Sequence, residues 1–308
     1  MSEFDWIDRY LRPIVRAPGA SGLTNDVAVL RSDGPVIATM DTIVEGVHFL
    51  STDPIETVAK KLLRVNVSDI LCKGAVPRDA LLSCAWPAEF SESDFAEFCR
   101  ALGEDLKQLK TSLVGGDMVR TPGPLTLTMT LTGRCLADGP VSRSGAQRGD
   151  IVCVTGEIGH AGFGLEDARA GRQTAAAGRY HVPVLPGREI AALVAQFATA
   201  SIDISDGLLS DTAHISRTSG TGIALRLEDV PFAQAAHTAE HALQQATSGD
   251  DYQTLFTVPS ERKEACLEAA QRSGLQLSVI GTVTNGSSVS LSFKGKPVPL
   301  PSRSGYTH

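Results

Sequence analysis

The sequence predicts a mixed α/β protein of two domains, and two observations support this prediction. Strand-like apolar runs alternate with helix-like amphipathic segments in both halves of the 308-residue chain. Residues 133–149 contain Gly, Pro, Ser and Arg without hydrophobic periodicity, and they separate the two halves. We therefore place the boundary near Asp138, which gives an N-terminal domain of residues 1–138 and a C-terminal domain of residues 139–308.

The first predicted strand and helix of the N-terminal half end close to acidic residues. Residues 36–40 form a short apolar run that is typical of a strand. Asp53-Pro54 then provides a start signal for a helix. Apolar residues recur at three- and four-residue spacing from Ile55 to Val65, and this stripe ends in Asp69, where an apolar residue is expected. A carboxylate on the apolar stripe of a helix needs a partner, so Asp69 is a candidate functional residue.

The rest of this half is predicted to hold one more helix and one more strand. Ser91 and Asp94 have the spacing of a capping box, and an apolar stripe continues to Leu109. Residues 124–132 alternate Leu or Met with Thr, which is typical of a half-buried antiparallel or barrel strand.

The C-terminal half is predicted to alternate strands and helices. Strands are expected near residues 151–155, 200–204, 222–227, 253–258, 276–282 and 288–293, and helices near residues 187–198 and 207–218. The second of these helices ends at Ser219-Gly220, a typical C-cap. Residues 174–183 are small, contain Gly and lack periodicity, so we expect a mobile loop there.

Composition excludes several classes of function. The chain has 28 basic and 35 acidic residues, a net charge of -7, and no basic run that could follow a nucleic acid backbone. No apolar segment approaches the length that a membrane span requires. The 6 cysteines include no CxxC pair, which favours buried reduced thiols. We therefore expect a cytoplasmic protein without nucleic acid or membrane partners.

A set of aspartates lies beside small or hydroxyl residues at the predicted ends of strands and helices. They are Asp26, Asp41, Asp69, Asp117, Asp203 and Asp206. Singly, Asp26 and Asp206 are also typical of turns and helix N-caps. Several buried carboxylates need cations to offset their repulsion. Oxygen ligands without His or Cys favour Mg²⁺, which commonly brings phosphates with it.

Motifs of other nucleotide-binding and hydrolytic enzymes are absent from the sequence. It contains no GxxxxGK[ST] loop, no GxGxxG after a strand, no HExxH and no GxSxG. Gly115-Gly116-Asp117 is predicted as a turn that permits close backbone approach to a phosphate or base. Gly159, Gly162 and Gly164 are interpreted as turn residues. An ATP-using enzyme of this sequence would therefore bind the nucleotide through metal ions and carboxylates.

Short segments along almost the whole chain resemble the successive motifs of the thiamine-monophosphate kinase family. In order, they are NDVAV, TMDTIVEGVHF, NVSDILCKGA, VGGDMVRTPGP, SRSGAQRGD, IDISDGL, SGDDYQTLF and GYTH. The VGGD and SDGL pieces are shared with the wider aminoimidazole-ribonucleotide synthetase-like superfamily. The segments DTIVEGVHF and SGDDY and the terminal aromatic-x-His are more specific to the thiamine branch.

This resemblance implies a fold and a reaction. The fold would be the two-domain aminoimidazole-ribonucleotide synthetase-like α/β fold, with an N-terminal domain that binds ATP and metal and contributes to a dimeric β-barrel. The C-terminal α/β domain would complete the active-site cleft. The reaction would be transfer of the γ-phosphoryl group of ATP to thiamine monophosphate, with release of thiamine diphosphate and ADP. The implied cofactors are several Mg²⁺ ions, and the implied assembly is a homodimer.

The resemblance also implies a role for each matching position. The metal ligands would be Asp26, Thr39, Asp41, Asp69, Asp117, Asp203 and Asp206, of which Asp69, Asp117 and Asp206 would be catalytic. ATP would contact Gly116, Asp117, Arg143 and Ser205. Thiamine monophosphate would contact His48, Asp250 and Tyr306. As isolated residues, a His and a Tyr more commonly have structural roles, and an Arg can instead form a surface salt bridge.

The sequence departs from the family pattern at several positions, and two alternative functions stay open. The departures are Asn25, Met40, Lys73, Met118 and Ser248, together with Asp250 in place of a Glu. Met40 and Met118 replace hydroxyl residues and would remove an oxygen near a metal site. The alternatives are an ATP-using member of the superfamily with another acceptor, and a nucleotide-binding protein without catalytic activity.

Overall fold

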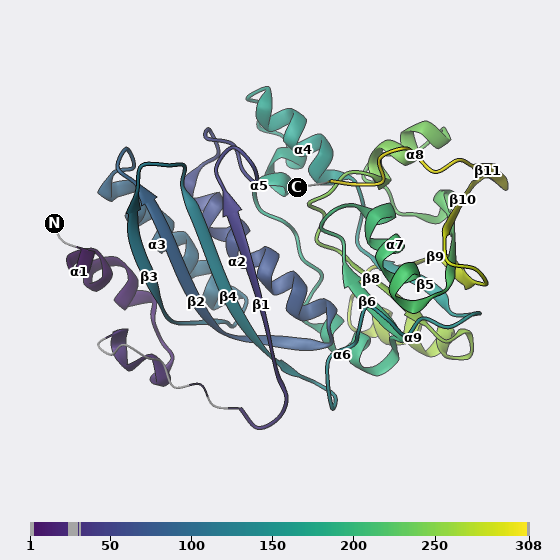
Figure 1. The fold of residues 1–308 in the computed structure, drawn as a ribbon, viewed down its shortest axis with the longest axis horizontal. Helices are drawn as coiled ribbons and strands as arrows, with labels where there is room; N and C mark the ends of the chain where they lie inside the picture. The colour runs from purple at the N-terminus through teal and green to yellow at the C-terminus, as the bar shows by residue number, and fades with distance from the viewer. Residues whose placement is uncertain (1–2, 24–29, 31, 307–308) are drawn as a thin grey trace. The chain divides into compact units, whose positions relative to one another are not determined.

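A computed structural model of the chain describes residues 3–23, 30 and 32–306 (Figure 1). The chain forms two compact units. Unit 1 comprises Met1–Ile70 and Val76–Arg134, and unit 2 comprises Leu71–Ala75 and Cys135–His308. Each unit combines a β-sheet with helices, so the predicted mixed α/β fold in two parts is confirmed.

Unit 1 is built on a four-stranded sheet with α2 and α3 along one face (Figure 1). The strand order is β1 (Val36–Val44), β4 (Thr126–Cys135), β2 (Ala75–Pro87) and β3 (Ser112–Thr121), and the helices are α2 (Ile55–Cys72) and α3 (Glu92–Gln108). Strand β1 is antiparallel to β4, whereas β2 is parallel to β3. Short helical turns precede the sheet: α1 (Glu3–Trp6), η1 (Ile7–Leu11), η2 (Arg12–Ile14) and η3 (Pro18–Leu23).

Local sequence signals account for several elements of unit 1. The apolar residues of β4 are fully buried, and its threonines are half-buried, as the alternation predicts. At the start of α3, the Ser91 hydroxyl accepts a hydrogen bond from Asp94 N, and Ser91 N donates to Asp94 Oδ2, so the predicted capping box is confirmed. The Trp86 ring of β2 meets the Phe95 ring of α3 edge-on, with 5.0 Å between the ring centroids. This contact packs the helix against the sheet.

The predicted Gly-Gly-Asp turn is wrong, because Gly115-Gly116-Asp117 lies inside β3. A Cβ at position 116 would lie 1.9 Å from the carbonyl oxygen of Leu82 in the neighbouring strand. Gly116 therefore permits close approach of β2, and this close contact between two strands explains the glycine. The sequence prediction also omitted β2 itself, whose apolar pattern is interrupted by Pro77 and Arg78.

Unit 2 is built on a seven-stranded sheet. The strand order is β11 (Lys296–Val298), β10 (Val289–Phe293), β7 (Gly222–Arg226), β9 (Leu277–Thr284), β5 (Ile151–Thr155), β8 (Thr254–Val258) and β6 (Ala200–Asp203). Strands β10 and β7 are parallel, and the other neighbouring pairs are antiparallel. The helices are α4 (His160–Arg169), α5 (Ala175–His181), α6 (Glu189–Phe197), α7 (Leu208–Ser219), α8 (Ala239–Ala246) and α9 (Lys263–Arg272), with η4 (Leu227–Asp229) and η5 (Ser260–Arg262).

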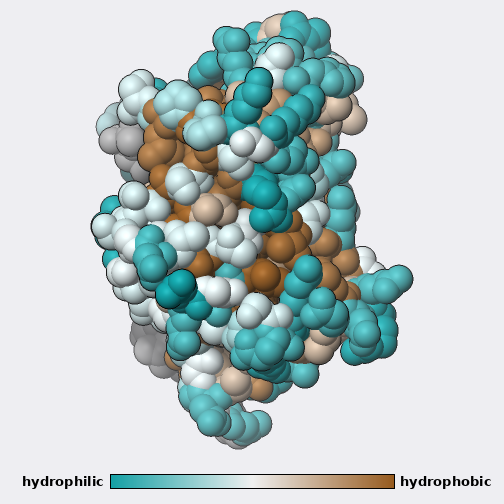
Figure 2. Space-filling view, turned by 90° about the vertical axis from the view of Figure 1, so that its right-hand side faces the viewer, coloured by the Kyte–Doolittle hydropathy of each residue, from teal (hydrophilic) through white to brown (hydrophobic). Residues whose placement is uncertain are grey.

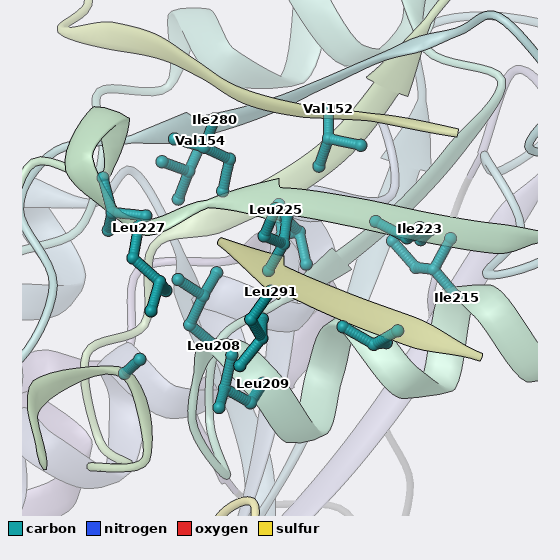
Figure 3. Close-up of a cluster of buried hydrophobic side chains, with 14 of the residues drawn as sticks. Val152, Val154, Leu208, Leu209, Ile215, Ile223, Leu225, Leu227, Ile280 and Leu291 are labelled. Atoms are coloured by element: carbon teal, nitrogen blue, oxygen red, sulfur yellow. The ribbon is translucent and has the colours of Figure 1, made fainter. Parts of the chain in front are cut away.

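Both faces of this sheet are covered, which explains the continuous apolar run of β5. All residues of β5 are buried. Val152 and Val154 belong to the core that includes Leu208 and Leu209 of α7 (Figure 3). The intervening Cys153 is fully buried, and its thiol pKa is raised by burial and by Cys266 of α9. The predicted C-cap of α7 is confirmed, since Gly220 adopts a left-handed conformation with φ of 66°.

The predicted mobile loop at residues 174–183 is wrong, because most of it forms α5. Thr174 caps this helix by accepting a hydrogen bond from Ala177 N at 3.1 Å. Gly162 and Gly164, predicted as turn residues, lie inside α4. A Cβ at Gly164 would lie 2.2 Å from the carbonyl oxygen of Ala176. Small residues in both helices thus allow α4 to pack closely on α5. Hydrophobic periodicity in the sequence does not reveal this requirement.

On the side seen in Figure 2, apolar residues occur in patches between hydrophilic side chains. None of the described helices is long and apolar enough to cross a membrane.

Candidate active site

In unit 1, three predicted metal ligands lie where β1 faces α2. Thr39 and Asp41 are two residues apart on β1, so their side chains share one face of the strand. The Thr39 hydroxyl donates a hydrogen bond to a carboxylate oxygen of Asp69 on α2. The fold therefore brings one hydroxyl and two carboxylates together, a set of hard oxygen donors.

The electrostatics of this group disfavour two ionised carboxylates. Burial and, to a smaller extent, the nearby Asp69 carboxylate raise the pKa of Asp41 from 3.8 to about 6. A bound cation would reverse both effects, because it would offset the repulsion and replace lost hydration.

Asn66 belongs to the same region and is missing from the sequence-based set. Its side-chain Oδ1 accepts a hydrogen bond from Asp41 N at 3.2 Å, and its Nδ2 donates to Leu62 O at 2.9 Å. Asn66 is fully buried. Its spacing of three residues from Asp69 in NVSD places both on one helix face, which is the signal that could have identified it.

Asp117 and Gly116 lie apart from this group within unit 1. They are on β3, and two strands separate β3 from β1 in the sheet order. At the usual strand spacing, Asp117 and Asp41 are about 14 Å apart across the sheet. The exposed Asp117 also helps to raise the pKa of Cys84, although burial of that thiol is the larger cause. One chain therefore does not bring Asp117 together with Asp41 and Asp69 in unit 1.

His48 is held in the turn after β1 by its own backbone and ring. Val44 N donates to His48 Nδ1 at 3.1 Å, and His48 N donates to Val44 O at 2.9 Å. Because Nδ1 accepts a hydrogen bond, the neutral ring carries its proton on Nε2. The buried Lys61 also donates to the His48 carbonyl, at 3.0 Å. The half-buried His48 therefore has a defined orientation and can act as an Nε2 donor.

In unit 2, the acidic loop, defined as residues 203–207, follows β6 and precedes α7. Asp203 is buried, and Ser205 and Asp206 are half-buried. Asp211, in the first turn of α7, is buried, and its Oδ2 accepts hydrogen bonds from Asp206 N and Gly207 N, each at 3.2 Å. Burial raises the pKa of Asp211 to about 8, and Asp203 and Asp206 contribute. The sequence-based set omitted Asp211, although it lies five residues after Asp206.

Carboxylate and imidazole atoms of unit 2 also lie close enough to share a cation. Ligand atoms of Asp206, Asp211 and His214 are within 4.8 Å of one another. The pKa of His214 is lowered by burial and by Arg217 and Arg143. Arg143 itself is exposed, and its carbonyl accepts a hydrogen bond from the Thr218 hydroxyl at 2.9 Å. Arg143 thus lies beside α7, the helix that carries Asp211 and His214.

The acidic loop also contacts the predicted substrate residues of unit 2. Its carbonyls accept three backbone hydrogen bonds of 2.8 Å: Tyr252 N donates to Ile204 O, Asp250 N to Ser205 O, and Tyr306 N to Asp206 O. The structure therefore brings Asp250 and Tyr306 to the loop that carries Asp203 and Asp206. The Tyr306 side chain is 41% exposed, which leaves its ring accessible to a ligand.

Asp250 occupies a constrained segment. Its φ is 66° and that of Tyr252 is 50°, both unusual for residues with side chains. The Tyr252 hydroxyl donates to Asp250 Oδ1 at 3.0 Å. Between them, the buried Asp251 accepts a hydrogen bond from Gly159 N at 2.7 Å, and burial raises its pKa to about 7. The segment is therefore fixed on both sides. The remaining predicted ligand, Asp26, lies outside the described residues.

Replacement of Asp41 by Asn tests the burial of this carboxylate in metal-free protein. The folded chain holds the Asp41 proton more tightly than the unfolded chain, so ionisation costs stability as pH rises from 3.8 to about 6. At neutral pH we expect Asp41→Asn to raise the free energy of unfolding by about 1 kcal/mol, allowing for partial exposure. The advantage should vanish below about pH 4.

Urea unfolding with a chelator present measures this difference. Both tryptophans, Trp6 and Trp86, lie in unit 1, so their fluorescence reports on the unit that contains Asp41. An equal difference between the two proteins at acidic and neutral pH would contradict the assigned cause.

Comparisons with known proteins match this chain to one family over almost its whole length. Residues 24–135 match the family model described as AIR synthase related protein, N-terminal domain, and residues 147–294 match its C-terminal counterpart. The thiamine-monophosphate kinase of Caulobacter vibrioides is 37% identical over 322 residues, which cover 100% of this chain and 91% of that protein.

Solved structures with a similar fold include thiamine-monophosphate kinases. The thiamine-monophosphate kinase of Stenotrophomonas maltophilia K279a has a TM-score of 0.83 at 28% identity, covering 97% of this chain and 98% of that one. AaThiL complexed with AMPPCP and TMP has a TM-score of 0.75 at 30% identity, covering 88% and 87%. The chain belongs to the thiamine-monophosphate kinase family.

Proposed function

We propose that this chain transfers the γ-phosphoryl group of ATP to thiamine monophosphate and releases thiamine diphosphate and ADP. Full-length similarity to thiamine-monophosphate kinases, one of them complexed with AMPPCP and TMP, is the observation that carries this proposal. The alternative of a different acceptor has no comparable observation in its favour.

We further propose that the chain uses several Mg²⁺ ions. The residues fit this ion, because Thr39, Asp41 and Asp69 supply hard oxygen atoms and because burial of Asp41 raises its pKa when no cation offsets the charge. Bound Mg²⁺ supplies charge neutralisation and a template for the phosphates. The proposed ligands are Asp26, Thr39, Asp41, Asp69, Asp117, Asp203 and Asp206, with Asp69, Asp117 and Asp206 as the catalytic ones. Within one chain Asp117 lies about 14 Å from Asp41, so we assign it to a separate ion from the one beside Thr39, Asp41 and Asp69.

The chain's own residues then bind and orient the two anions. Phosphoryl transfer needs positioning and charge stabilisation more than covalent help, which suits a site without a side-chain nucleophile. The acceptor phosphate is already ionised near neutral pH, so no strong general base is required. We assign ATP contacts to Gly116, Asp117, Arg143 and Ser205, where the Arg143 guanidinium can form a fork with a phosphate.

Acceptor recognition is assigned to His48, Asp250 and Tyr306. The Nε2 proton of His48 can be donated to the ligand, because Nδ1 is already an acceptor. The exposed Tyr306 ring can stack on the cationic thiazolium or on the pyrimidine. The Asp250 carboxylate can attract the same cation.

A homodimer is proposed from the outward face of the unit 1 sheet. Val36 and Met40 of β1 are 51% and 65% exposed, and on the same face Leu81 of β2 and Val119 of β3 are 41% and 49% exposed. Thr42 and Thr128 share this face, since their hydroxyls are 2.8 Å apart. An apolar and threonine-rich sheet face of this kind is suited to cover the same face of a second copy.

A cytoplasmic location is also proposed. All six cysteines are free and buried, as expected of a protein from a reducing compartment. Recovery of the native chain from a membrane or extracellular fraction would contradict this location.

Incubation of the purified chain with ATP, Mg²⁺ and thiamine monophosphate should yield thiamine diphosphate and ADP in equal amounts. Chromatographic separation of the thiamine species and an ADP assay measure both products, and a metal chelator should abolish them. ADP without thiamine diphosphate would indicate another acceptor or hydrolysis. Metal-dependent ATP binding without any transfer would indicate a protein that has lost catalysis.

Asp69→Asn and Asp206→Asn should each lower turnover on the order of 100-fold, because each removes a charge that we assign to metal binding. The free energy of unfolding should change by less than about 1 kcal/mol, since the loss of one carboxylate relieves repulsion in the metal-free chain. Turnover and urea unfolding are measured on the same preparations. Glu104→Gln, in an exposed ion pair with Arg100, is the control. Near-normal turnover in both Asn variants would exclude the assignment.

Met40→Asp should convert a dimer to a monomer, because it places a charge in the proposed apolar interface. Sedimentation velocity gives the mass of each protein in solution. Leu300→Asp provides a matched change at a residue of unit 2 that is 50% exposed, and it should leave the dimer intact. A wild-type monomer, or a dimer unaffected by Met40→Asp, would exclude this interface.

A further inference from the structure

The acidic loop is hydrogen-bonded to two other segments of unit 2, residues 249–252 and residues 305–306. Its carbonyl oxygens accept the backbone hydrogen bonds from Asp250, Tyr252 and Tyr306 described above. The acidic residues and the residues assigned to the acceptor are therefore linked through one short stretch of backbone. A shift of that stretch would move both groups together.

Two glycines let these segments approach the acidic loop closely. A Cβ at Gly249 would lie 2.6 Å from Ser205 O, and a Cβ at Gly305 would lie 2.5 Å from Asp206 O. Both distances are far below van der Waals contact, so a side chain at either position would displace the loop or the approaching segment. The three segments are thus packed with little room for independent movement.

Asp211 holds the acidic loop from its other side. Its Oδ2 accepts from the two consecutive N–H groups of Asp206 and Gly207, and the residue is 2% exposed. The carbonyls of the loop point to the substrate segments, while these N–H groups point to Asp211. This carboxylate therefore determines where the loop lies relative to α7.

We propose that Asp211 is a positioning residue that holds the acidic loop, and through it both the metal carboxylates and the acceptor residues Asp250 and Tyr306. This inference rests on the proposed function for the identity of the acceptor, thiamine monophosphate. Asp211 acts through the backbone of the loop. Metal affinity and acceptor affinity in unit 2 therefore depend on one side chain that is not among the metal or acceptor ligands assigned under the proposed function.

Asp211→Ala and Asp211→Asn separate positioning from direct metal binding. Ala removes the acceptor of two buried N–H groups, so affinity for Mg²⁺ and for thiamine monophosphate should each fall about tenfold or more. Asn keeps an oxygen in place of Oδ2, so both affinities should stay within about threefold of wild type. Mg²⁺ titration of the thermal unfolding temperature, and calorimetry of thiamine monophosphate with a non-hydrolysable ATP analogue, measure the two affinities without turnover.

Asp150→Ala is the matched control for loss of stability. Asp150 is 4% exposed, and its Oδ2 accepts from Gln147 N at 3.0 Å and from the Thr199 hydroxyl at 2.6 Å, so its removal also breaks two hydrogen bonds of a buried carboxylate in unit 2. We expect a lower unfolding temperature with unchanged Mg²⁺ and acceptor affinity. Equal losses in Asp150→Ala and Asp211→Ala would overturn the proposal, because they would reflect general destabilisation.

A second variant keeps the test decisive if Asp211→Ala does not fold. Gly305→Ala forces the Tyr306 segment and Asp206 O apart, so it should weaken acceptor binding about tenfold. Wild-type acceptor affinity in this variant would overturn the link between segment and loop. Equal loss of Mg²⁺ affinity in Asp211→Asn and Asp211→Ala would make Asp211 a direct ligand and overturn positioning.

The two proposals fail in different ways. If the wild-type chain does not phosphorylate thiamine monophosphate, the proposed function is wrong, and the Mg²⁺ titration still decides the role of Asp211. If the wild-type chain is active and Asp211→Ala matches it in both affinities, only the positioning role is wrong.

Discussion

The burial of carboxylates is the constraint on which the candidate site residues of each unit depend. Asp41, Asp211 and Asp251 have pKa values raised to about 6, 8 and 7, and burial is the largest cause for each. An ionised carboxylate in such a place requires hydrogen-bond donors or a cation. The structure supplies backbone N–H groups to Asp211 and Asp251, and it places hydroxyl and amide groups beside Asp41 and Asp69.

The same local arrangement meets this constraint in both units. In unit 1, β1 carries Asp41 and a later helix, α2, carries Asp69 to the same face. In unit 2, β6 ends at Asp203 and the next helix, α7, carries Asp211 back to the connecting loop. A strand followed by a helix thus delivers two acids to one place while the rest of each element stays in the core. The buried helix stripes and apolar strands provide the rigidity that such a site needs.

Sequence periodicity predicted the elements that bury one regular face, and it did not predict contacts between backbones. Strand β4 and helix α3 were predicted because the Leu–Thr alternation and the capping box are local signals. Strand β3 and helices α4 and α5 were mispredicted, because Gly116 and Gly164 are required by neighbouring carbonyls that are distant in sequence. Sequence spacing also could not reveal that strand order separates Asp117 from Asp41 within unit 1.

Among the candidate site residues too, sequence patterns identified those with a characteristic motif and missed those that act through backbone contacts. Asp41 and Asp69 were proposed from their positions at the ends of predicted elements and Thr39 from motif resemblance, and the fold brings them together. Asn66 and Asp211 escaped notice because each supports a neighbour through the backbone, a role without a characteristic residue pattern. Supporting residues of this kind become visible only when hydrogen-bond partners are known.

Not every buried acid in this chain belongs to a site, and Asp105 shows the difference. This residue of α3 is 1% exposed, and Arg64 of α2 binds both of its oxygens, at 2.7 and 2.9 Å. The guanidinium fork satisfies the carboxylate completely, so Asp105 joins two helices and has no capacity for a ligand. Asp41 and Asp211 are instead beside other carboxylates, which a structural ion pair would avoid. Burial next to like charge, rather than burial alone, therefore separates the acids assigned to metal binding and its support from those that hold the fold.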